Sequence, residues 1–213
     1  MRGAWLLIIA RLMTCQFQAL SFDLDGTLAS VGWRRIGLWR GFLAWPRVVG
    51  AYEPAVKALR GRRVRCWSEA LLAEVSQRSG EPPERAQAGL DAVIGKAWPR
   101  LFAGARPPKP VRDLLRAADE AGLPRVVVSD HAALDKLSAM GLGGWAAVID
   151  CSALGALKPL PDGLWAASAQ LGVPIGRVLH VGDRWDTDGR AAEAAGCAFL
   201  HVDTPDLVRS AGL

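Results

Sequence analysis

Short apolar segments alternate with helical segments through the second half of the 213-residue chain, and this alternation is the feature that most constrains its fold. Strand-like apolar runs occupy residues 125–128, 147–149, 177–181 and 198–201. Apolar residues recur at helical spacing over residues 111–121, 132–140, 162–171 and 187–195. Strands that are apolar throughout and that alternate with helices indicate a parallel sheet covered on both faces. A further strand of this kind is predicted near the N-terminus, over residues 19–22.

Residues 31–105 interrupt this pattern and have a different character. They contain five of the nine tryptophans and show no alternation of strands and helices. Helical spacing of apolar residues is found over residues 33–44, 48–59, 68–79 and 84–97. A proline-rich stretch, residues 106–110, then makes a stiff linker. We therefore predict a core formed by residues 1–30 and 106–213 and a helical insertion formed by residues 31–105.

Electric charge also separates the two parts. The insertion has 13 lysines and arginines against 6 aspartates and glutamates, a net charge of +7, whereas the rest has 13 against 15, a net charge of −2. A basic surface suits an anionic ligand or a nucleic acid, but it also occurs in any arginine-rich protein. Charge alone does not choose among these three interpretations.

The cysteines and the N-terminal residues bear on the cellular compartment. The four cysteines lie far apart and form no CxxC pair, which argues against a disulfide framework or a zinc site and favours a reducing cytoplasm. The apolar run at residues 5–10 is much shorter than the roughly 20 residues that a membrane-spanning helix requires. Arg2 before this run resembles the start of a signal peptide, but no small-x-small cleavage pattern follows, so we expect a helical or frayed extension before Gln18.

The strongest chemical signal follows the first predicted strand, in the segment Phe22-Asp23-Leu24-Asp25-Gly26-Thr27-Leu28. Open α/β sheets bind ligands at the carboxyl ends of their strands, where this segment lies. Two carboxylates at such a place need a cation or hydrogen-bond donors to offset desolvation, and oxygen ligands suit Mg²⁺. An Asp-Gly turn on the surface would be the alternative if the motif were only DxDG.

The whole heptapeptide resembles motif I of the haloacid dehalogenase superfamily. The resemblance implies that Asp23 is a nucleophile that forms an aspartyl-phosphate and that Asp25 is the general acid and base. It also implies that the Asp23 carboxylate and the Asp25 backbone carbonyl bind Mg²⁺. Dehalogenases and phosphonatase-like members have another residue in place of Asp25, so its presence favours phosphomonoester chemistry.

Two later segments resemble motifs II and III of the same superfamily. Val126-Val127-Val128-Ser129 is an apolar strand that ends in a hydroxyl, which implies that Ser129 binds a phosphoryl oxygen. The family often has Asn next, whereas this chain has Asp130-His131, which leaves the second contact with the substrate open. Gly155-Ala156-Leu157-Lys158-Pro159 resembles motif III, in which Lys158 neutralises the phosphoryl charge and holds Asp23 in place.

Motif IV of the superfamily, GDxxxxD, is matched by Gly182-Asp183 together with Asp188. The match implies that Asp183 completes the Mg²⁺ shell and that Asp188 binds a metal-bound water or orients Lys158. Asp186 is a second candidate for the role of Asp188.

These matches identify the chain as a haloacid dehalogenase-like hydrolase with a Rossmann-like three-layer α/β core and a helical cap of the C1 type, residues 31–105. The expected function is Mg²⁺-dependent hydrolysis of a small phosphorylated metabolite, with no membrane partner. The alternatives are a sugar-phosphate mutase and a non-catalytic scaffold that binds protein or nucleic acid through the basic insertion, although the basic run 60–65 is more typical of a solvated turn. Arg34 or Arg35 is predicted to bind a remote anionic group of the substrate, with a solvated helix face as the alternative. The substrate itself and the oligomeric state are not predicted.

Overall fold

The structure is a computed structural model that describes residues 16–29, 32 and 38–213. Five strands form one parallel sheet in the order β3-β2-β1-β4-β5. Their bounds are β1 Ala19–Phe22, β2 Arg125–Ser129, β3 Ala147–Asp150, β4 Val178–Gly182 and β5 Ala198–His201. The predicted α/β class and parallel sheet are confirmed, and β1 and β5 have the predicted bounds.

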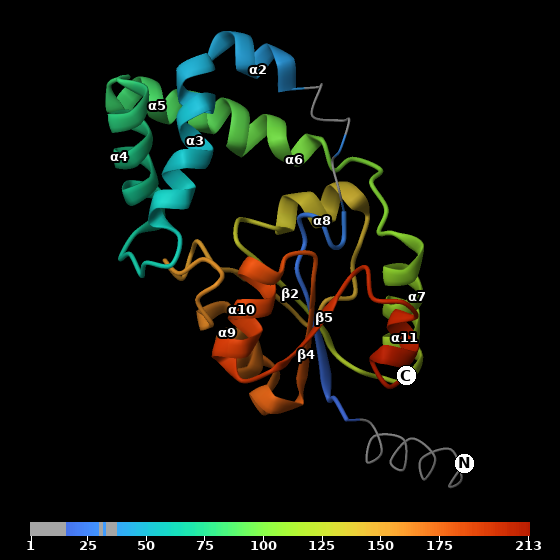
Figure 1. The fold of residues 1–213 in the computed structure, drawn as a ribbon. Helices are drawn as coiled ribbons and strands as arrows, with labels where there is room; N and C mark the ends of the chain where they lie inside the picture. The colour runs from blue at the N-terminus through green and yellow to red at the C-terminus, as the bar shows by residue number, and fades with distance from the viewer. Residues whose placement is uncertain (1–15, 30–31, 33–37) are drawn as a thin grey trace, which may run out of the picture.

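Helices cover both faces of this sheet (Figure 1). One face carries α7 Lys109–Glu120, α8 Leu134–Met140 and α11 Leu207–Ser210, and the other carries α9 Asp162–Leu171 and α10 Arg190–Ala195. Strand β2 shows why two layers of helices are needed. Val127 belongs to the hydrophobic cluster that includes α7, whereas Val126 and Val128 belong to the cluster that includes α9 and α10. Because side chains of a strand alternate between its faces, an entirely apolar strand requires cover on both.

Helix α7 illustrates how the sequence pattern produces the packing. Its buried residues are Val111, Leu114, Leu115 and Ala118, spaced three and four apart, so they form one stripe against the sheet. Helix α9 has the predicted bounds and ends at Gly172, which adopts a left-handed conformation.

Two predicted helices differ from the structure. The helix expected at 187–195 is divided into a wide π-helical turn, Trp185–Gly189, and α10. The backbone N–H groups of Asp188 and Gly189 both donate to the carbonyl of Arg184, and the Asp188 carboxylate accepts from the Arg184 N–H, which explains the wide turn. The helix expected at 84–97 becomes α5 Pro83–Leu90 and a second π-helical segment, Asp91–Ala97. Helix α11 was not predicted.

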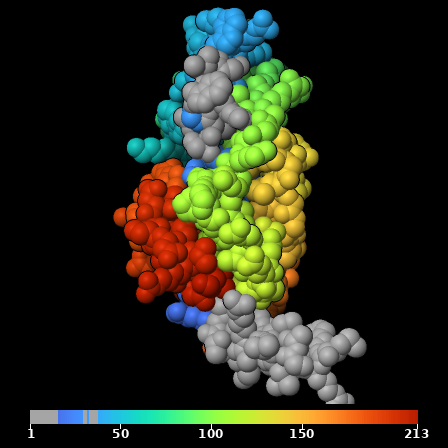
Figure 2. Space-filling model, turned by 90° about the vertical axis from the view of Figure 1, so that its right-hand side faces the viewer, coloured from blue at the N-terminus to red at the C-terminus, as the bar shows by residue number. Residues whose placement is uncertain are grey.

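Among the described residues, the segment between β1 and α7 contains helices, as expected, and the first part of the helix predicted at 33–44 lies outside them. The segment comprises α2 Trp39–Ala44, α3 Pro46–Leu59, α4 Trp67–Ser79, α5 and α6 Trp98–Arg100, together with the π-helical segment before α6. Six buried residues of this insertion form a hydrophobic cluster of their own: Val48, Ala51, Ala55, Val75, Ala86 and Leu90. Helices α2 to α6 lie together beyond one end of the sheet (Figure 1), and from the side the blue surface of α2 is seen at that end of the molecule (Figure 2).

None of the described helices has both the length and the apolar character needed to span a membrane. Three of the four cysteines, Cys66, Cys151 and Cys197, lie within the described residues and are free thiols.

Candidate active site

Three neighbouring strands bring motifs I, II and IV to one edge of the sheet. Asp23 directly follows β1, Ser129 ends β2, and Asp183 directly follows β4. Phe22 of β1 lies opposite Val127 of β2 and Val181 of β4, and the Asp23 N–H donates to the Val181 carbonyl at 2.9 Å. Since these strands are parallel and in register, their carboxyl ends place the three polar residues together.

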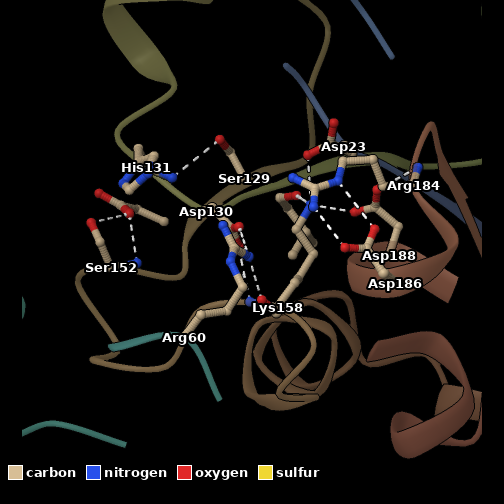
Figure 3. Close-up of polar contacts among 12 residues, drawn as sticks. Asp23, Arg60, Ser129, Asp130, His131, Ser152, Lys158, Arg184, Asp186 and Asp188 are labelled. Carbon is tan, nitrogen blue, oxygen red and sulfur yellow. Dashed lines mark hydrogen bonds and ion pairs between the residues drawn. The ribbon is translucent and has the colours of Figure 1, made fainter. Parts of the chain in front are cut away.

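Lys158 joins these elements from the motif III loop. Its Nζ donates to Asp23 Oδ1 at 2.5 Å, to Asp188 Oδ1 at 2.6 Å and to the Val128 carbonyl at 3.2 Å (Figure 3). The side chain is only 2% exposed. Burial by itself would lower the pKa of Lys158, but the carboxylates of Asp23 and Asp188 outweigh it and raise that pKa well above its ordinary value. The buried ammonium therefore stays charged and contacts the residue expected to be the nucleophile.

Three acidic side chains at this edge form a group that could hold a metal ion. Asp23, Asp183 and Asp188 each offer one carboxylate oxygen, and these oxygens lie within 4.8 Å of one another. Asp23 Oδ2 and Asp183 Oδ1 are buried and have no hydrogen-bond partner. Burial raises the pKa of Asp23 to about 8, although the Lys158 ammonium opposes the shift, and burial also raises the pKa of Asp183. Carboxyl groups with raised pKa values and with oxygens that lack hydrogen-bond partners suit a site for a divalent cation. A bound cation would favour the ionised form of both carboxyl groups.

Gly26 makes this arrangement of carboxylates possible. Its φ is +106°, and an added Cβ would collide with the carboxylate of Asp183. Its N–H donates to the Ala29 carbonyl at 2.8 Å and closes the turn after motif I. The glycine that looked like an ordinary turn residue is thus required by the close approach of motif IV.

The two candidates for the second acidic role lie in different surroundings. Asp188 is buried and bonded to Lys158, whereas Asp186 is exposed and forms two hydrogen bonds with the Arg184 guanidinium, at 3.2 and 2.7 Å. Burial would raise the pKa of Asp188, but Lys158 and His180 outweigh it and hold that pKa well below its ordinary value. Of the two, only Asp188 lies in the cluster.

The side chain of Asp25 does not contact Lys158 and pairs instead with a different lysine, Lys136. Its carboxylate Oδ2 accepts a hydrogen bond from Lys136 Nζ at 2.5 Å, and its side chain is 37% exposed. Lys136 was not singled out from the sequence, yet a signal was present. It occupies the inward stripe of α8 with Ala133, Leu137 and Met140, where an apolar residue is expected.

Two polar side chains lie at the end of β2: the buried hydroxyl of Ser129 and the carboxylate of Asp130, which accepts hydrogen bonds. Ser129 is fully buried, and its Oγ accepts from the His131 N–H at 3.4 Å. Asp130 stands where the family often has Asn. Its carboxylate accepts hydrogen bonds from the backbone N–H of Lys158 at 2.9 Å and from Arg60 Nη1 at 2.6 Å. The aspartate that replaces the usual asparagine therefore forms an ion pair with an arginine of the insertion.

The insertion reaches this edge through α3, α4 and the turn between them. Arg60, in the turn, also donates a hydrogen bond to the backbone carbonyl of Lys158. Two aromatic residues of the insertion contact His131: Tyr52 Oη lies 3.4 Å from His131 Nε2, and the ring centroid of Trp67 lies 6.2 Å from that of His131. Figure 3 shows Arg60 and His131. Burial lowers the pKa of His131 and raises that of Tyr52. From the sequence, Arg60 was considered only as part of the basic run 60–65, and its contacts with this edge were not predicted, because its partners lie 70 and 98 residues away.

Arg34 and Arg35 lie outside the described residues, so the expected contact with a remote anionic group stays a prediction.

Known proteins share this architecture. The family model for haloacid dehalogenase-like hydrolases matches residues 17–196. Protein CbbY (plasmid) from Cupriavidus necator is 29% identical over 203 residues, covering 88% of this chain and 78% of that protein.

Two solved structures show the same fold. A predicted phosphoglycolate phosphatase from Haemophilus somnus 129PT has a TM-score of 0.62 and 19% identity, covering 93% of this chain and 92% of that one. The 2-haloacid dehalogenase from Pseudomonas syringae pv. tomato DC3000 has a TM-score of 0.60 and 20% identity, covering 86% of this chain and 85% of that one. Because the family model spans most of the chain and includes all four motifs, the chain belongs to the haloacid dehalogenase-like hydrolases.

Proposed function

We propose that this hydrolase is a Mg²⁺-dependent phosphatase that cleaves a small phosphomonoester through an aspartyl-phosphate on Asp23. The observation that supports this most directly is the contrast between Asp23 and Asp25. Asp23 is buried against Lys158, whereas Asp25 is 37% exposed and paired with Lys136. Two carboxyl groups in different surroundings suit two different tasks, nucleophile and general acid-base.

In the first step one carboxylate oxygen of Asp23 attacks phosphorus. A bond forms between that oxygen and phosphorus while the bond between phosphorus and the leaving oxygen breaks, and Asp25 donates a proton to the leaving oxygen. Lys158 and the Ser129 hydroxyl would bind the phosphoryl oxygens, since Lys158 contacts Asp23 and the Val128 carbonyl and Ser129 ends the neighbouring strand. The product alcohol then leaves.

In the second step water attacks the phosphorus of the aspartyl-phosphate. Asp25, now ionised, takes a proton from this water, and the bond between phosphorus and Asp23 breaks. Inorganic phosphate leaves, the Asp23 carboxylate is restored and Asp25 is again protonated. The same two side chains therefore complete the cycle.

The carboxylates of Asp23 and Asp183 and the backbone carbonyl of Asp25 would hold Mg²⁺. The bound ion would shield the negative charges of Asp23 and the phosphoryl group from each other. Asp188 would act by orienting Lys158, which it already contacts.

The test is release of inorganic phosphate by the purified protein from a panel of phosphorylated metabolites, with Mg²⁺ and with EDTA. We expect Mg²⁺-dependent release from at least one small phosphomonoester and none after chelation. Conversion of a sugar phosphate to its isomer without phosphate release would instead indicate a mutase. Chloride release from 2-chloropropionate without any phosphatase activity would overturn the proposal.

Two further expectations belong with it. The substrate is expected to be a small phosphorylated metabolite bound under the basic insertion, with Arg34 or Arg35 on a remote anionic group. A cytoplasmic location is expected from the cysteine spacing alone.

A further inference from the structure

Lys136 is a buried charged residue for which the proposed steps have no task. Its side chain is 4% exposed, and its Nζ lies 5.1 Å from the ring centroid of Phe102, which is itself fully buried. A lysine at such a place loses most of its hydration, and burial of an ammonium costs several kcal/mol unless a partner compensates. An aliphatic residue would fill the same space without that cost.

The compensating partner is Asp25. Among the described residues, Asp25 is the only acidic side chain that pairs with Lys136, and it uses one oxygen, Oδ2, at 2.5 Å. Within the same part of the chain, the other oxygen, Oδ1, has no hydrogen-bond partner, and the side chain is 37% exposed. One oxygen is thus held by a side chain of α8, while the other has no partner among the described residues.

We infer that Lys136 is a positioning residue that holds Asp25 by one carboxylate oxygen so that the other oxygen faces the leaving group of the substrate. The inference rests on the proposed function, because it assigns Lys136 to the proton transfer made by Asp25. Helix α8 begins five residues after Ser129, so the element that follows motif II also orients the acid of motif I. Displacement of a proton donor by about 1 Å is enough to slow a reaction roughly 100-fold.

The experiment compares two aryl phosphates whose leaving groups need protonation to different degrees. Lys136→Met keeps an unbranched apolar side chain of nearly the same length and removes the ammonium group, and a flexible methionine can pack beside the Phe102 ring. We expect kcat/KM for phenyl phosphate to fall roughly 10- to 100-fold, the range for a weakened general acid. For p-nitrophenyl phosphate, which has a better leaving group, we expect a fall of less than about 3-fold.

Two controls separate a positioning role from a structural one. Lys109→Met removes an exposed lysine that pairs with Asp113, and it should leave both kcat/KM values unchanged. Lys136→Arg, which keeps the charge, should recover part of the phenyl phosphate activity. Equal losses on both esters, or no loss on either, would overturn the inference.

A measurement that does not depend on activity distinguishes failure of the inference from failure of the proposed function. If Lys136 and Asp25 act as a pair, the melting temperature of the Lys136→Met/Asp25→Asn double variant should fall by less than the sum of the two single falls. Additive falls would refute the pairing, even in a protein that hydrolyses both esters. A wild-type protein that releases phosphate neither from these esters nor from any metabolite of the panel would refute the proposed function, and the melting temperatures would still decide whether the pair exists.

Discussion

The edge of the sheet and the helical insertion both contribute side chains that contact Lys158, but they do so in different ways. At the edge, Lys158 is 2% exposed and bonds Asp23 and Asp188 from two other motifs. The insertion reaches over with Arg60, which is 21% exposed, and with the longer contact of Tyr52 to His131. The charged side chains at the edge of the sheet form a buried network, whereas the contacts made by the insertion are more exposed to solvent or longer. We therefore expect the edge to determine the reaction and the insertion to determine which substrate is accepted.

Replacement of Asp23 tests the edge and has the largest expected effect. Asp23→Asn should reduce phosphate release roughly 1,000-fold or more, because the nucleophile is lost while the shape is kept. Radiolabelled substrate should leave no acid-stable, hydroxylamine-sensitive label on the protein.

Asp186→Asn is the matched control for Asp23→Asn, since Asp186 lies near the same edge but is exposed and bonded to Arg184. It should retain activity within about 3-fold of the wild type. Activity of the Asp23 variant within tenfold of the wild type would contradict its role as nucleophile.

Removal of Lys158 tests whether the buried network also stabilises the fold. Lys158→Met leaves Asp23 and Asp188 buried without their common cation, so the free energy of unfolding in EDTA should fall by about 3–5 kcal/mol. Urea unfolding followed by circular dichroism measures this change.

The matched lysine is Lys109, which is 78% exposed and paired with Asp113. Lys109→Met should change the free energy of unfolding by less than about 1 kcal/mol. Similar losses in the two variants would mean that the buried network contributes no more than a surface ion pair.

Truncation of Arg60 tests the other region. Arg60→Ala removes the contacts of the insertion to Asp130 and to the Lys158 carbonyl, and kcat/KM for the preferred substrate should fall roughly 10- to 100-fold, equivalent to about 1–3 kcal/mol. Arg63→Ala is the comparison, because Arg63 also joins the insertion to the core, through Asp162, but is 58% exposed. If both variants lose the same activity, docking of the insertion matters in general and Arg60 has no special place.

The smallest expected effect concerns His131 and pH. Burial lowers the pKa of His131 from its ordinary value of 6.5, although the carboxylates of Asp130 and Asp25 oppose the shift. Between the lowered folded pKa and 6.5 the unfolded chain binds a proton that folded His131 excludes, so stability is present above pH 6.5 and is lost as the pH falls. His180 has a lowered pKa for the same reason and contributes in the same direction.

His131→Gln should therefore weaken the loss of stability between pH 7.5 and pH 5.5 without abolishing it. Urea unfolding at the two pH values measures the difference. An unchanged pH dependence in this variant would show that His131 is protonated as readily in the folded protein as in the unfolded chain.

Much of the core, and the place of the candidate catalytic residues in it, was predictable from the sequence, because the signals are local. Most strands are largely apolar runs, and a residue expected to carry the chemistry follows or ends the strand, as Asp23 follows β1 and Asp183 follows β4. Since parallel strands align their carboxyl ends, finding the strands was enough to predict that these residues meet. The predicted bounds of the helix at 187–195 were wrong, because the Asp188 carboxylate accepts a hydrogen bond from the Arg184 backbone N–H and the first turn is wider than an α-helical turn.

The sequence by itself therefore determined the α/β sheet, the inserted helices and the residues at the strand ends. Only the tertiary structure decided which charges pair across the chain. Lys136 meets Asp25 over a separation of 111 residues, and Arg60 meets Asp130 over 70. The same structure places Asp188 against Lys158 and Asp186 against Arg184, although both aspartates lie in one turn. Such pairs depend on how helices and loops pack on the sheet, and no local periodicity records that packing.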